Sequence, residues 1–493
     1  MDPLPRRAPS SPPPPATFGA VPDRGSSISV LTGALPPVRT PDPRAAVTER
    51  VRSHRRPRSG TGPQRASFTL LAVAIANAIV VEVLFFTASD APSLMLSVGR
   101  FLGLHAAVVL ALQLVLVARV PWLDRRLGMG QLTVWHRWVG ITLAWTIIVH
   151  ATLASWAYAR INHWPFDTLK DKWLGSLGTL AGIISGTVLL VVVLASTRFM
   201  RRRLPYELWH AVHLGTYAVV AFAIVHQTIE NPISQPATWA KVYWWLLWTV
   251  AIGLFVAGRV LLPLYRNLRH RLRISDIVAE SDDVTSVYVT GRDLDKMPLD
   301  AGQFFLWRFL TPTRWWQVNP WSLSKAPDGQ SLRLTAKAVG GGSAGLRKLK
   351  VGTRVFVEGP YGAFTSRHRM KSASLLIAGG VGITPIRSLM ESLDGNIIVL
   401  YRARSEADAP LLSELRHLAV TRRAKLQLVT GRTRDTTPAP LSPEHLLAVV
   451  PDIKQRDVYV CGPTAMTDAV LATLRQLGVP KTQLHAEVFA MAD

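Results

Sequence analysis

Apolar residues in the first half of the chain are gathered into six long runs, separated by short polar loops. Each run is close to the ~20 residues that a helix needs to cross the hydrocarbon core of a bilayer. The pattern therefore predicts a bundle of six transmembrane helices. The predicted spans are residues 67–87, 94–118, 132–157, 174–196, 206–227 and 239–264.

The second half of the chain changes pattern twice. From Ile274 to Phe364, short β-branched or alternating runs such as VTSVYVT and LRLTAKAV are separated by Gly, Pro and Asp, which predicts an antiparallel β-barrel. From Ser374 onward, apolar strands such as SLLIAGG and NIIVLYRAR alternate with helical segments, which predicts a parallel sheet with crossover helices. The predicted fold class is a multi-domain membrane protein with an all-α six-helix transmembrane bundle, an antiparallel β-barrel domain and an α/β parallel-sheet nucleotide domain.

We predict four segments of different composition. Residues 1–66 are rich in Pro, Arg, Ser and Gly and show no apolar periodicity, so we expect a disordered, basic cytoplasmic tail. The helix bundle is expected at 67–265, the β-barrel at 270–370 and the nucleotide domain at 371–493.

The formal net charge of +24 comes from 56 Lys and Arg against 32 Asp and Glu. Basic clusters alternate with the predicted spans, so the positive-inside rule places both termini and the soluble domains on the cytoplasmic side of the plasma membrane. These clusters flank apolar runs and form no nucleic-acid-binding motif, so we expect a lipid bilayer as partner and no nucleic acid. The single cysteine, Cys461, excludes an intramolecular disulfide and an iron–sulfur centre held by several cysteines.

The third and fifth spans each carry two histidines that are candidate ligands for haem iron. His136 and His150 are 14 residues apart, and on an ideal helix they lie within about 40° of one face and roughly 21 Å apart. His213 and His226 repeat the arrangement, and the topology pairs His136 with His213 at the inner level and His150 with His226 at the outer level. Any one of them alone is more often a core or interfacial residue. Four at paired depths favour two stacked haems, because ionisable residues inside a membrane are costly.

Two features near these histidines stay open. The 13 residues from His213 to His226 leave the two rings about 140° apart on an ideal helix, which implies a local irregularity or laterally offset haems. Arg100, near the outer end of the second span, is either a side chain that snorkels to the interface or a cation for a propionate of the outer haem. His210 is an alternative inner ligand whose spacing matches less well.

Two strand ends carry motifs for a nucleotide. LLIAGGVGITPIRSL places a glycine-rich turn between a buried strand and a helix, so backbone amides and the helix N-terminus can approach a pyrophosphate. VYVCGPTAM ends a second strand, at the edge where open α/β sheets bind ligands. Cys461 is either a small buried side chain or a group beside the nucleotide. The other candidates are Gly379, Gly380, Gly382, Thr384, Pro385, Gly462 and Pro463.

Two motifs in the predicted barrel precede the nucleotide fold. NPWSLSKAP offers an aromatic ring and hydroxyls that suit the ring and edge of a flavin, and KAVGGGSAGL offers a lysine and an amide-rich turn that suit a phosphate. Each motif alone is more often an ordinary strand end or hairpin. The flavin-binding candidates are Asn319, Pro320, Trp321, Ser322, Ser324, Lys337, Gly340, Gly341, Gly342 and Ser343.

The strand NIIVLY is followed by Arg402 and Arg404, and no acidic residue comes directly after it. An acidic residue at this position would hold a ribose hydroxyl, whereas arginines pair with a 2′-phosphate. We therefore favour NADPH over NADH, although surface arginines are common without any ligand.

In combination, these motifs resemble the ferric reductase and NADPH oxidase superfamily, in which a six-helix haem domain is fused to FAD and NAD(P) domains. The resemblance covers residues 67–493 and rests on the histidine pairs, a flavin motif of the HPF[ST]L type, GGxGITP and CGP. It implies FAD, two haems b and NADPH or NADH, with electrons passing from NAD(P)H through FAD, the inner haem and the outer haem to an acceptor on the far side. It also implies that Cys461 lies beside the nicotinamide and shapes hydride transfer.

The acceptor is less clearly marked. Two imidazoles per iron leave no open coordination position, so we expect reduction at the haem edge, with a ferric iron chelate as the favoured acceptor and O₂ as the alternative. The oxidases often carry a further histidine one turn beyond the outer ligand, where this chain has Ala154, and Asn319 and Trp321 replace the usual His and Phe of the flavin motif. A membrane-anchored flavin reductase and a non-enzymatic haem-binding sensor remain further alternatives, and the sequence defines no partner subunit.

Overall fold

The computed structural model describes residues 62–87, 92–230, 238–431 and 439–489. The predicted tail therefore lies, up to residue 61, outside the described residues. Apolar helices fill the first part of the described chain, and sheets with covering helices fill the second part, as the two sequence patterns predict. The exact limits of the four predicted segments stay predictions.

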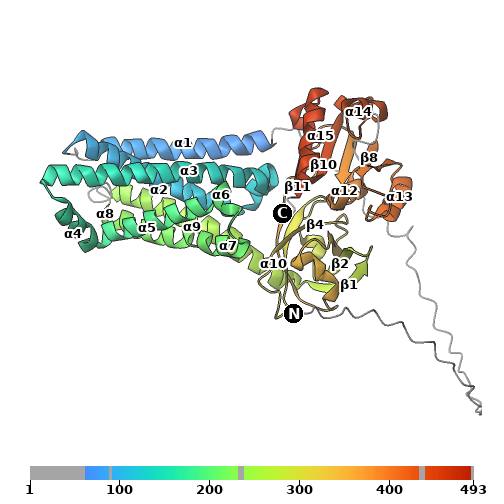
Figure 1. Cartoon of the computed structure of the whole chain (residues 1–493), viewed down its shortest axis with the longest axis horizontal. Helices are drawn as coiled ribbons and strands as arrows, with labels where there is room; N and C mark the ends of the chain where they lie inside the picture. Colours follow the sequence, from blue (N-terminus) through green and yellow to red (C-terminus); the bar gives the residue numbers. More distant parts are fainter. Residues whose placement is uncertain (1–61, 88–91, 231–237, 432–438, 490–493) are drawn as a thin grey trace, which may run out of the picture. The chain divides into compact units, whose positions relative to one another are not determined.

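Six helical segments of the described chain are long and apolar enough to cross a membrane, and Figure 1 shows these helices side by side. They confirm the predicted six-helix bundle. The spanning segments contain α1 (Gly62–Thr87), α2 (Leu94–Val117), α3 (Pro121–Asn162), α5 (Leu177–Ala195), α7 (Tyr206–Leu214) with α8 (Thr216–Glu230), and α9 (Thr238–Val256), which continues through the π-helix η2 (Ala257–Leu261) into α10 (Leu262–His270). Two short helices, α4 (Phe166–Gly175) and α6 (Arg198–Arg201), connect them.

Helix α3 begins earlier than predicted and has a kink. Gly128 adopts φ +77°, a conformation that L side chains rarely adopt, so the helix axis changes direction between its first two turns and the apolar span. The first part reaches the barrel, where the backbone N–H of Gly362 donates to the Asp124 carboxylate over 3.0 Å. The helix that carries two of the candidate ligands is therefore anchored at its start on the soluble region.

Helix α10 reaches the same part of the barrel. The side-chain amide of Asn267 donates to the carbonyl of Val357 over 2.7 Å, and its oxygen accepts from the Val357 N–H over 2.9 Å. Nearby, the buried carboxylate of Glu358 pairs with Arg119, at the start of the turn into α3, and with Arg308 over 2.5 Å. These contacts join both helices to one strand.

The described residues that follow α10 form two three-stranded antiparallel sheets, ordered β1-β2-β5 and β4-β3-β6. An isolated bridge between Leu323 and Leu334 connects them, and Phe305, Trp307 and Val287 are fully buried in their shared core. The predicted antiparallel strands are thus present. Their bounds are β1 (Arg273–Ala279), β2 (Val284–Thr290), β3 (Phe304–Phe309), β4 (Asn319–Ser322), β5 (Ser331–Lys337) and β6 (Val355–Tyr361), with the short helix α11 (Gly341–Ala344) after β5.

The last part of the described chain forms a five-stranded parallel sheet ordered β11-β10-β7-β8-β9. Apolar side chains of α12 and α13 pack on one face, and those of α14 and α15 pack on the other, which confirms the predicted α/β fold. The strands are β7 (Ala373–Gly379), β8 (Ile397–Arg402), β9 (Lys425–Val429), β10 (Arg456–Pro463) and β11 (Leu484–Phe489). The helices are α12 (Ile383–Ser392), α13 (Leu412–Thr421), α14 (Pro443–Val449) and α15 (Thr464–Gln476).

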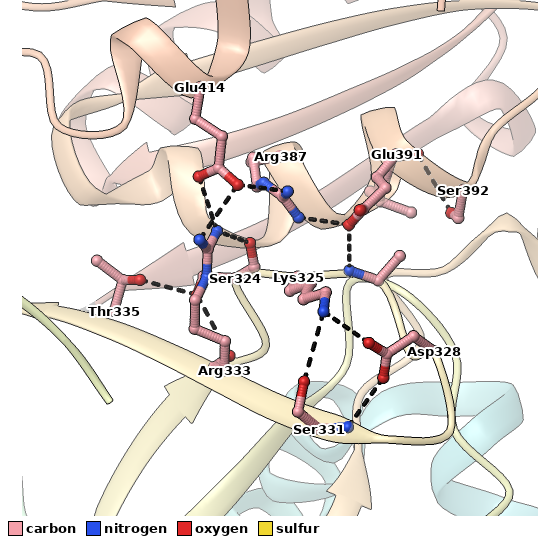
Figure 2. A network of polar contacts seen from close by, with 12 residues as sticks. Ser324, Lys325, Asp328, Ser331, Arg333, Thr335, Arg387, Glu391, Ser392 and Glu414 are labelled. Carbon is pink, nitrogen blue, oxygen red and sulfur yellow. Dashed lines mark hydrogen bonds and ion pairs between the residues drawn. The ribbon is translucent and has the colours of Figure 1, made fainter. Parts of the chain in front are cut away.

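A buried polar network joins the antiparallel sheets to the nucleotide fold (Figure 2). The carboxylate of Glu414, on α13, accepts from Arg333 of β5 over 3.0 Å and from Arg387 of α12 over 2.5 Å. Both arginine side chains are only 4% exposed, so each charge needs a buried partner. Glu391 adds a second contact, because it pairs with Arg387 and accepts from the Ala326 N–H over 2.7 Å.

We predict that Glu414→Ala lowers the unfolding midpoint of the soluble region by about 4–8 °C, because it leaves two buried guanidiniums short of a partner, at a cost of about 2 kcal/mol. Thermal unfolding of the whole protein in detergent, followed by tryptophan fluorescence, measures this shift. The matched control is Glu406→Ala, which removes an exposed pair with Arg416 and should leave the midpoint within about 1 °C. Equal shifts in both variants would show that the buried network adds no stability.

Candidate functional site

The four predicted ligand histidines form two facing pairs. The ring centroids of His136 and His213 are 6.2 Å apart, and those of His150 and His226 are 6.3 Å apart. His136 and His213 form the proximal pair, which lies nearer along α3 to its anchor on the barrel, and His150 and His226 form the distal pair. His213 rather than His210 is therefore the residue that meets His136.

Both spacings suit one metal ion held between two imidazoles. A metal ion lies about 2 Å from each imidazole nitrogen that binds it, so the centroids of two rings on opposite sides of one ion are about 6 Å apart. No three His, Cys, Asp or Glu side chains converge on a common point in the part of the chain that the structure describes. Two protein ligands are too few for a structural zinc site, whereas a haem iron obtains its other ligands from the porphyrin.

The distal rings are oriented by backbone carbonyls of two neighbouring helices. Nδ1 of His150 lies 2.7 Å from the carbonyl oxygen of Gly99 on α2, and Nδ1 of His226 lies 2.9 Å from that of Gly178 on α5. Since a carbonyl only accepts, each Nδ1 must carry the proton, which leaves each Nε2 with a free lone pair for a metal. Arg100 follows Gly99 in the chain and is half-buried, but its side chain leaves α2 about 100° away from Gly99.

Glycines one turn further along make room for the same rings. A Cβ on Gly103 would lie 2.6 Å from Cε1 of His150, and a Cβ on Gly182 would lie 2.7 Å from Nδ1 of His226. Any larger residue at these positions would force the imidazoles to move. The two distal histidines are thus held in the same way. A glycine carbonyl (Gly99 or Gly178) accepts from Nδ1, and a glycine four residues later (Gly103 or Gly182) leaves room for the ring.

A break in the fifth span brings His213 and His226 onto one side. Helix α7 ends at Leu214 and α8 begins at Thr216, and the Gly215 N–H bonds to Val212 three residues earlier over 3.0 Å. Such a tight turn rotates the chain by about 120° per residue instead of 100°. Three such residues add about 60°, which removes less than half of the 140° mismatch expected for an ideal helix. The structure thus contains a local irregularity at Gly215, and the offset of the haems stays a prediction.

The proximal pair has a different environment. Nδ1 of His136 and Nδ1 of His213 are buried and make no hydrogen bond in the structure. Trp209 stacks on the His213 ring, with centroids 5.1 Å apart, and the guanidinium of Arg201 lies 3.9 Å from the Trp209 ring centroid. Gln113 donates to the His136 carbonyl over 3.0 Å, which ties α2 to α3 at this level.

The two nucleotide motifs meet at the carboxyl ends of adjacent strands. Cys461 of β10 is in register with Ala378 of β7, and a Cβ on Gly462 would lie 3.2 Å from Cα of Gly379. The turn that contains Gly380 and Gly382 therefore lies directly against the CGP turn. Thr384 and Pro385 are buried in the first turn of α12, where the Thr384 hydroxyl donates to Val381.

Four flavin candidates of the first barrel motif differ in their contacts. Ser322 ends β4 with its hydroxyl buried and without a hydrogen-bond partner, which suits a hydroxyl that awaits a ligand. Trp321 and Pro320 pair with Phe305 and Leu306 on β3. Ser324, by contrast, is already bonded to Arg333 and Thr335 inside the network of Figure 2, so its hydroxyl has an internal structural role.

The second barrel motif lies against the first. A Cβ on Gly342 would be 2.5 Å from Oδ1 of Asn319, so β4 and the glycine turn are neighbours. Gly340 and Gly341 lie in the same turn, where the Ser343 hydroxyl accepts from the Gly340 N–H over 3.3 Å. Arg314 also reaches this turn and donates to the carbonyl of Gly342 over 3.1 Å. The sequence analysis missed this arginine, because nothing in its own segment, TPTRWWQ, relates it to a turn so far along the chain.

A shallow cleft between the antiparallel sheets and the nucleotide fold brings Lys337 close to Gly380 and Val381. The Lys337 ammonium pairs with Asp283 over 2.9 Å at the same cleft. Two candidates from different motifs therefore border one surface.

The two arginines after β8 differ in their contacts. The Arg402 guanidinium donates to the carbonyls of Ala403, Val429 and Gly431, so its donors hold the ends of β8 and β9 together. Arg404 is exposed in the following bend. Arg404 is accordingly the better placed of the two to meet a phosphate.

Glu487 is a further residue that the sequence analysis missed. It lies on β11 in register with Cys461, and parallel neighbours in register project from the same face of a sheet. Burial, with a smaller contribution from the charge of Asp124, raises the pKa of Glu487 from 4.5 to about 7. Burial likewise raises the pKa of the Cys461 thiol, so this cysteine is a neutral, unreactive thiol at neutral pH.

Two family descriptions match this chain. Residues 102–224 match "Ferric reductase like transmembrane component", and residues 376–471 match "Oxidoreductase NAD-binding domain". The first range contains three of the four paired histidines, His136, His150 and His213. The second contains the glycine-rich and CGP turns. The matches confirm the resemblance predicted from the sequence.

Curated relatives align with the chain over different lengths. A flavohemoprotein of Xylella fastidiosa is 25% identical over 69% of this chain and 92% of that protein. The ferredoxin reductase component of a 3-ketosteroid-9-alpha-monooxygenase from Rhodococcus rhodochrous is 27% identical over 44% of this chain and 64% of that protein. The solved FAD/NAD-binding domain of nitric oxide dioxygenase from Vibrio cholerae is 25% identical, with a TM-score of 0.38 over 45% of this chain and 99% of that domain.

We predict that Glu487→Gln raises the thermal stability at pH 8 but not at pH 4. Below pH 4.5 both the folded and the unfolded chain hold the proton, and between about 4.5 and 7 only the folded chain does, so the wild type loses stability as the pH rises through this window. The glutamine variant lacks this loss. Melting temperatures of the whole protein in detergent across pH 4–8 test the sign, with Glu406→Gln as an exposed control. A variant curve parallel to the wild-type curve would contradict the assignment.

Proposed function

Since the chain is a membrane-embedded, NAD(P)H-dependent flavin oxidoreductase that joins a ferric-reductase-like transmembrane component to an oxidoreductase NAD-binding domain, we propose that it moves electrons across the plasma membrane to a ferric iron chelate. The proposed route runs from NAD(P)H through FAD and two haems b, held by the proximal and then the distal histidine pair. The termini and soluble domains are on the cytoplasmic side. The single observation that carries this proposal is the pair of matching imidazole separations at two depths of one bundle.

The histidines supply the axial ligands in this proposal. When bound, FAD accepts a hydride from NAD(P)H and passes on its electrons singly, and each haem iron carries one electron at a time. His150 and His226 present Nε2 because their Nδ1 protons are committed to Gly99 and Gly178. Arg100, next to Gly99, is placed to meet an anionic propionate of the distal haem.

In the soluble half, the residues position the two nucleotides. In this proposal, the unpartnered Ser322 hydroxyl bonds to the edge of the flavin. Its phosphates are bound by Arg314, Lys337 and the turn at Gly342. The contact between the glycine-rich turn and the turn at Gly462 supports a nicotinamide position beside the thiol of Cys461 and the carboxyl of Glu487. Below about pH 7 both groups are neutral, so there they would orient the ring and exclude water without adding charge.

The choice of a ferric chelate rests on coordination. An iron with an imidazole on each side has no position for O₂ to bind, so a soluble one-electron acceptor that meets the haem edge is favoured. Ala154, four residues beyond His150, provides no polar group for oxygen chemistry at that level. Reduction of O₂ to superoxide is the competing outcome in the experiment that follows.

We predict that anaerobic NADPH bleaches the flavin of the purified protein and then reduces two haems, and that a ferric chelate reoxidises them faster than air does. Absorbance at the flavin and haem bands records each step. His150→Ala should leave the flavin and proximal haem reducible and slow chelate reduction at least tenfold, whereas His136→Ala should stop reduction of the distal haem by NADPH. His210→Ala is the matched control and should behave as wild type.

Each other outcome of this experiment points to a different function. Protein without any haem absorbance would be a membrane-anchored flavin reductase, and unbleached flavin with bound haem would favour a haem-binding sensor. Faster reoxidation by air than by the chelate, with superoxide formed, would replace the ferric acceptor with O₂.

We predict that Arg404→Ala raises the KM for NADPH about tenfold and leaves the KM for NADH unchanged, because a charge-assisted contact to a 2′-phosphate contributes about 1.5 kcal/mol. Steady-state flavin reduction with each nucleotide measures the two constants. Arg416→Ala, on the exposed face of α13, is the control. An equal change for both nucleotides would exclude a phosphate-specific role for Arg404.

A further inference from the structure

A carboxylate and an imidazole meet between α1 and α2, partly exposed on the bundle and away from both histidine pairs. Oε1 of Glu82, on α1, lies 3.5 Å from Nε2 of His105, on α2. Both residues belong to helical segments that are otherwise strongly apolar. Ionisable side chains within a membrane are costly, and they usually mark a proton or ion pathway.

The hydrogen bonds of His105 define where its labile proton lies. Nδ1 of His105 is 2.9 Å from the carbonyl oxygen of Phe101, so Nδ1 is protonated and Nε2 faces Glu82. One proton between Nε2 and Oε1 makes the pair neutral overall, whichever atom carries it. The pair can then gain one further proton on the carboxylate, or lose the shared one.

The position of the pair relates it to the distal histidines. His105 follows Gly103 by two residues, which turns α2 by about 200°, so His105 lies on the opposite face of α2 from the ring of His150 that borders Gly103. The pair and the distal ligand are thus separated by about one helix diameter, roughly 10 Å. Glu82 is five residues from Thr87, where α1 ends, about 8 Å along the helix, which is close enough to the distal surface for exchange with water.

We propose that Glu82 and His105 form a proton-binding site that balances the charge of an electron at the distal histidine pair. This inference rests on the proposed function. When one electron arrives at the distal haem, the pair takes up one proton from the aqueous phase at the distal end. When the electron leaves for the acceptor, the proton returns to that phase, so no net proton is consumed.

Neighbouring groups are poor candidates for the same response. On α1, α2 and the helices packed against them, the other ionisable side chains of the described distal half are Arg100, His150, Tyr158, Arg160, Lys241 and Tyr243. Arginine stays charged at every working pH, lysine and tyrosine titrate only near pH 10 in water, and the Tyr243 hydroxyl already donates to Asn77. A metal-bound His150 cannot take up a proton on Nε2.

The test is a potentiometric titration of the haem-loaded protein between pH 6 and 8.5. The distal haem is identified as the one lost in His150→Ala. In wild type its midpoint potential should fall with rising pH, and in Glu82→Gln, which keeps the shape and a hydrogen bond, this slope should disappear. Glu230→Gln removes a distal carboxylate that is bonded instead to Ser176 over 2.6 Å, and it should keep the wild-type slope.

A second measurement needs only the wild type. Rapid reduction in weakly buffered detergent with a pH-indicator dye should show uptake of up to one proton per electron at the distal haem. An unchanged slope in a haem-replete Glu82→Gln protein, or reduction without proton uptake in wild type, would overturn the inference. Absence of haem from the wild type itself would contradict the proposed function instead.

Discussion

The proposed function of the membrane half depends on one spacing: two imidazole rings on different helices must stay about 6 Å apart for one metal ion to lie between them. Neither α3 nor α8 can enforce this distance alone, because an imidazole rotates about its own side-chain bonds. At the distal pair, the carbonyls of Gly99 and Gly178 remove that freedom. Each distal histidine is therefore held by two helices, the one that carries it and the one that orients its ring.

The proximal pair achieves the same separation by other means. His136 and His213 lack a carbonyl for Nδ1, and the ring of Trp209 takes over as a flat support for His213. Stacking fixes the plane of a ring but not which nitrogen carries the proton. The orientation of the imidazole rings is thus fixed by hydrogen bonds at the distal pair. It is less constrained at the proximal pair.

Most of the fold could be predicted because it depends on local patterns. Runs of about 20 apolar residues gave the spans, alternation gave the barrel strands, and the glycine turns gave the edge of the parallel sheet. An ideal helix did not place His213 and His226 on one face, and the tight turn at Gly215, which changes the rotation of every later residue, is not visible in the sequence pattern. Arg314 and Glu487 could not be found for a different reason: each gains its meaning from a partner distant in the chain, at Gly342 and at Cys461.

The two halves of the chain meet around strand β6 and the residues that follow it, with a further contact from Arg125 to the carbonyl of Pro298. Asn267 of α10 binds both backbone groups of Val357, while Glu358 pairs with Arg119 just before α3. Asp124 of α3 accepts from Gly362, directly after the same strand. Because the Glu358 carboxylate is buried between two arginines, separating these elements would leave charges unpaired in a poorly hydrated place. Strand β6, which pairs with β3 on the side away from the flavin-motif strand β4, therefore anchors the start of α3, the helix that carries His136 and His150.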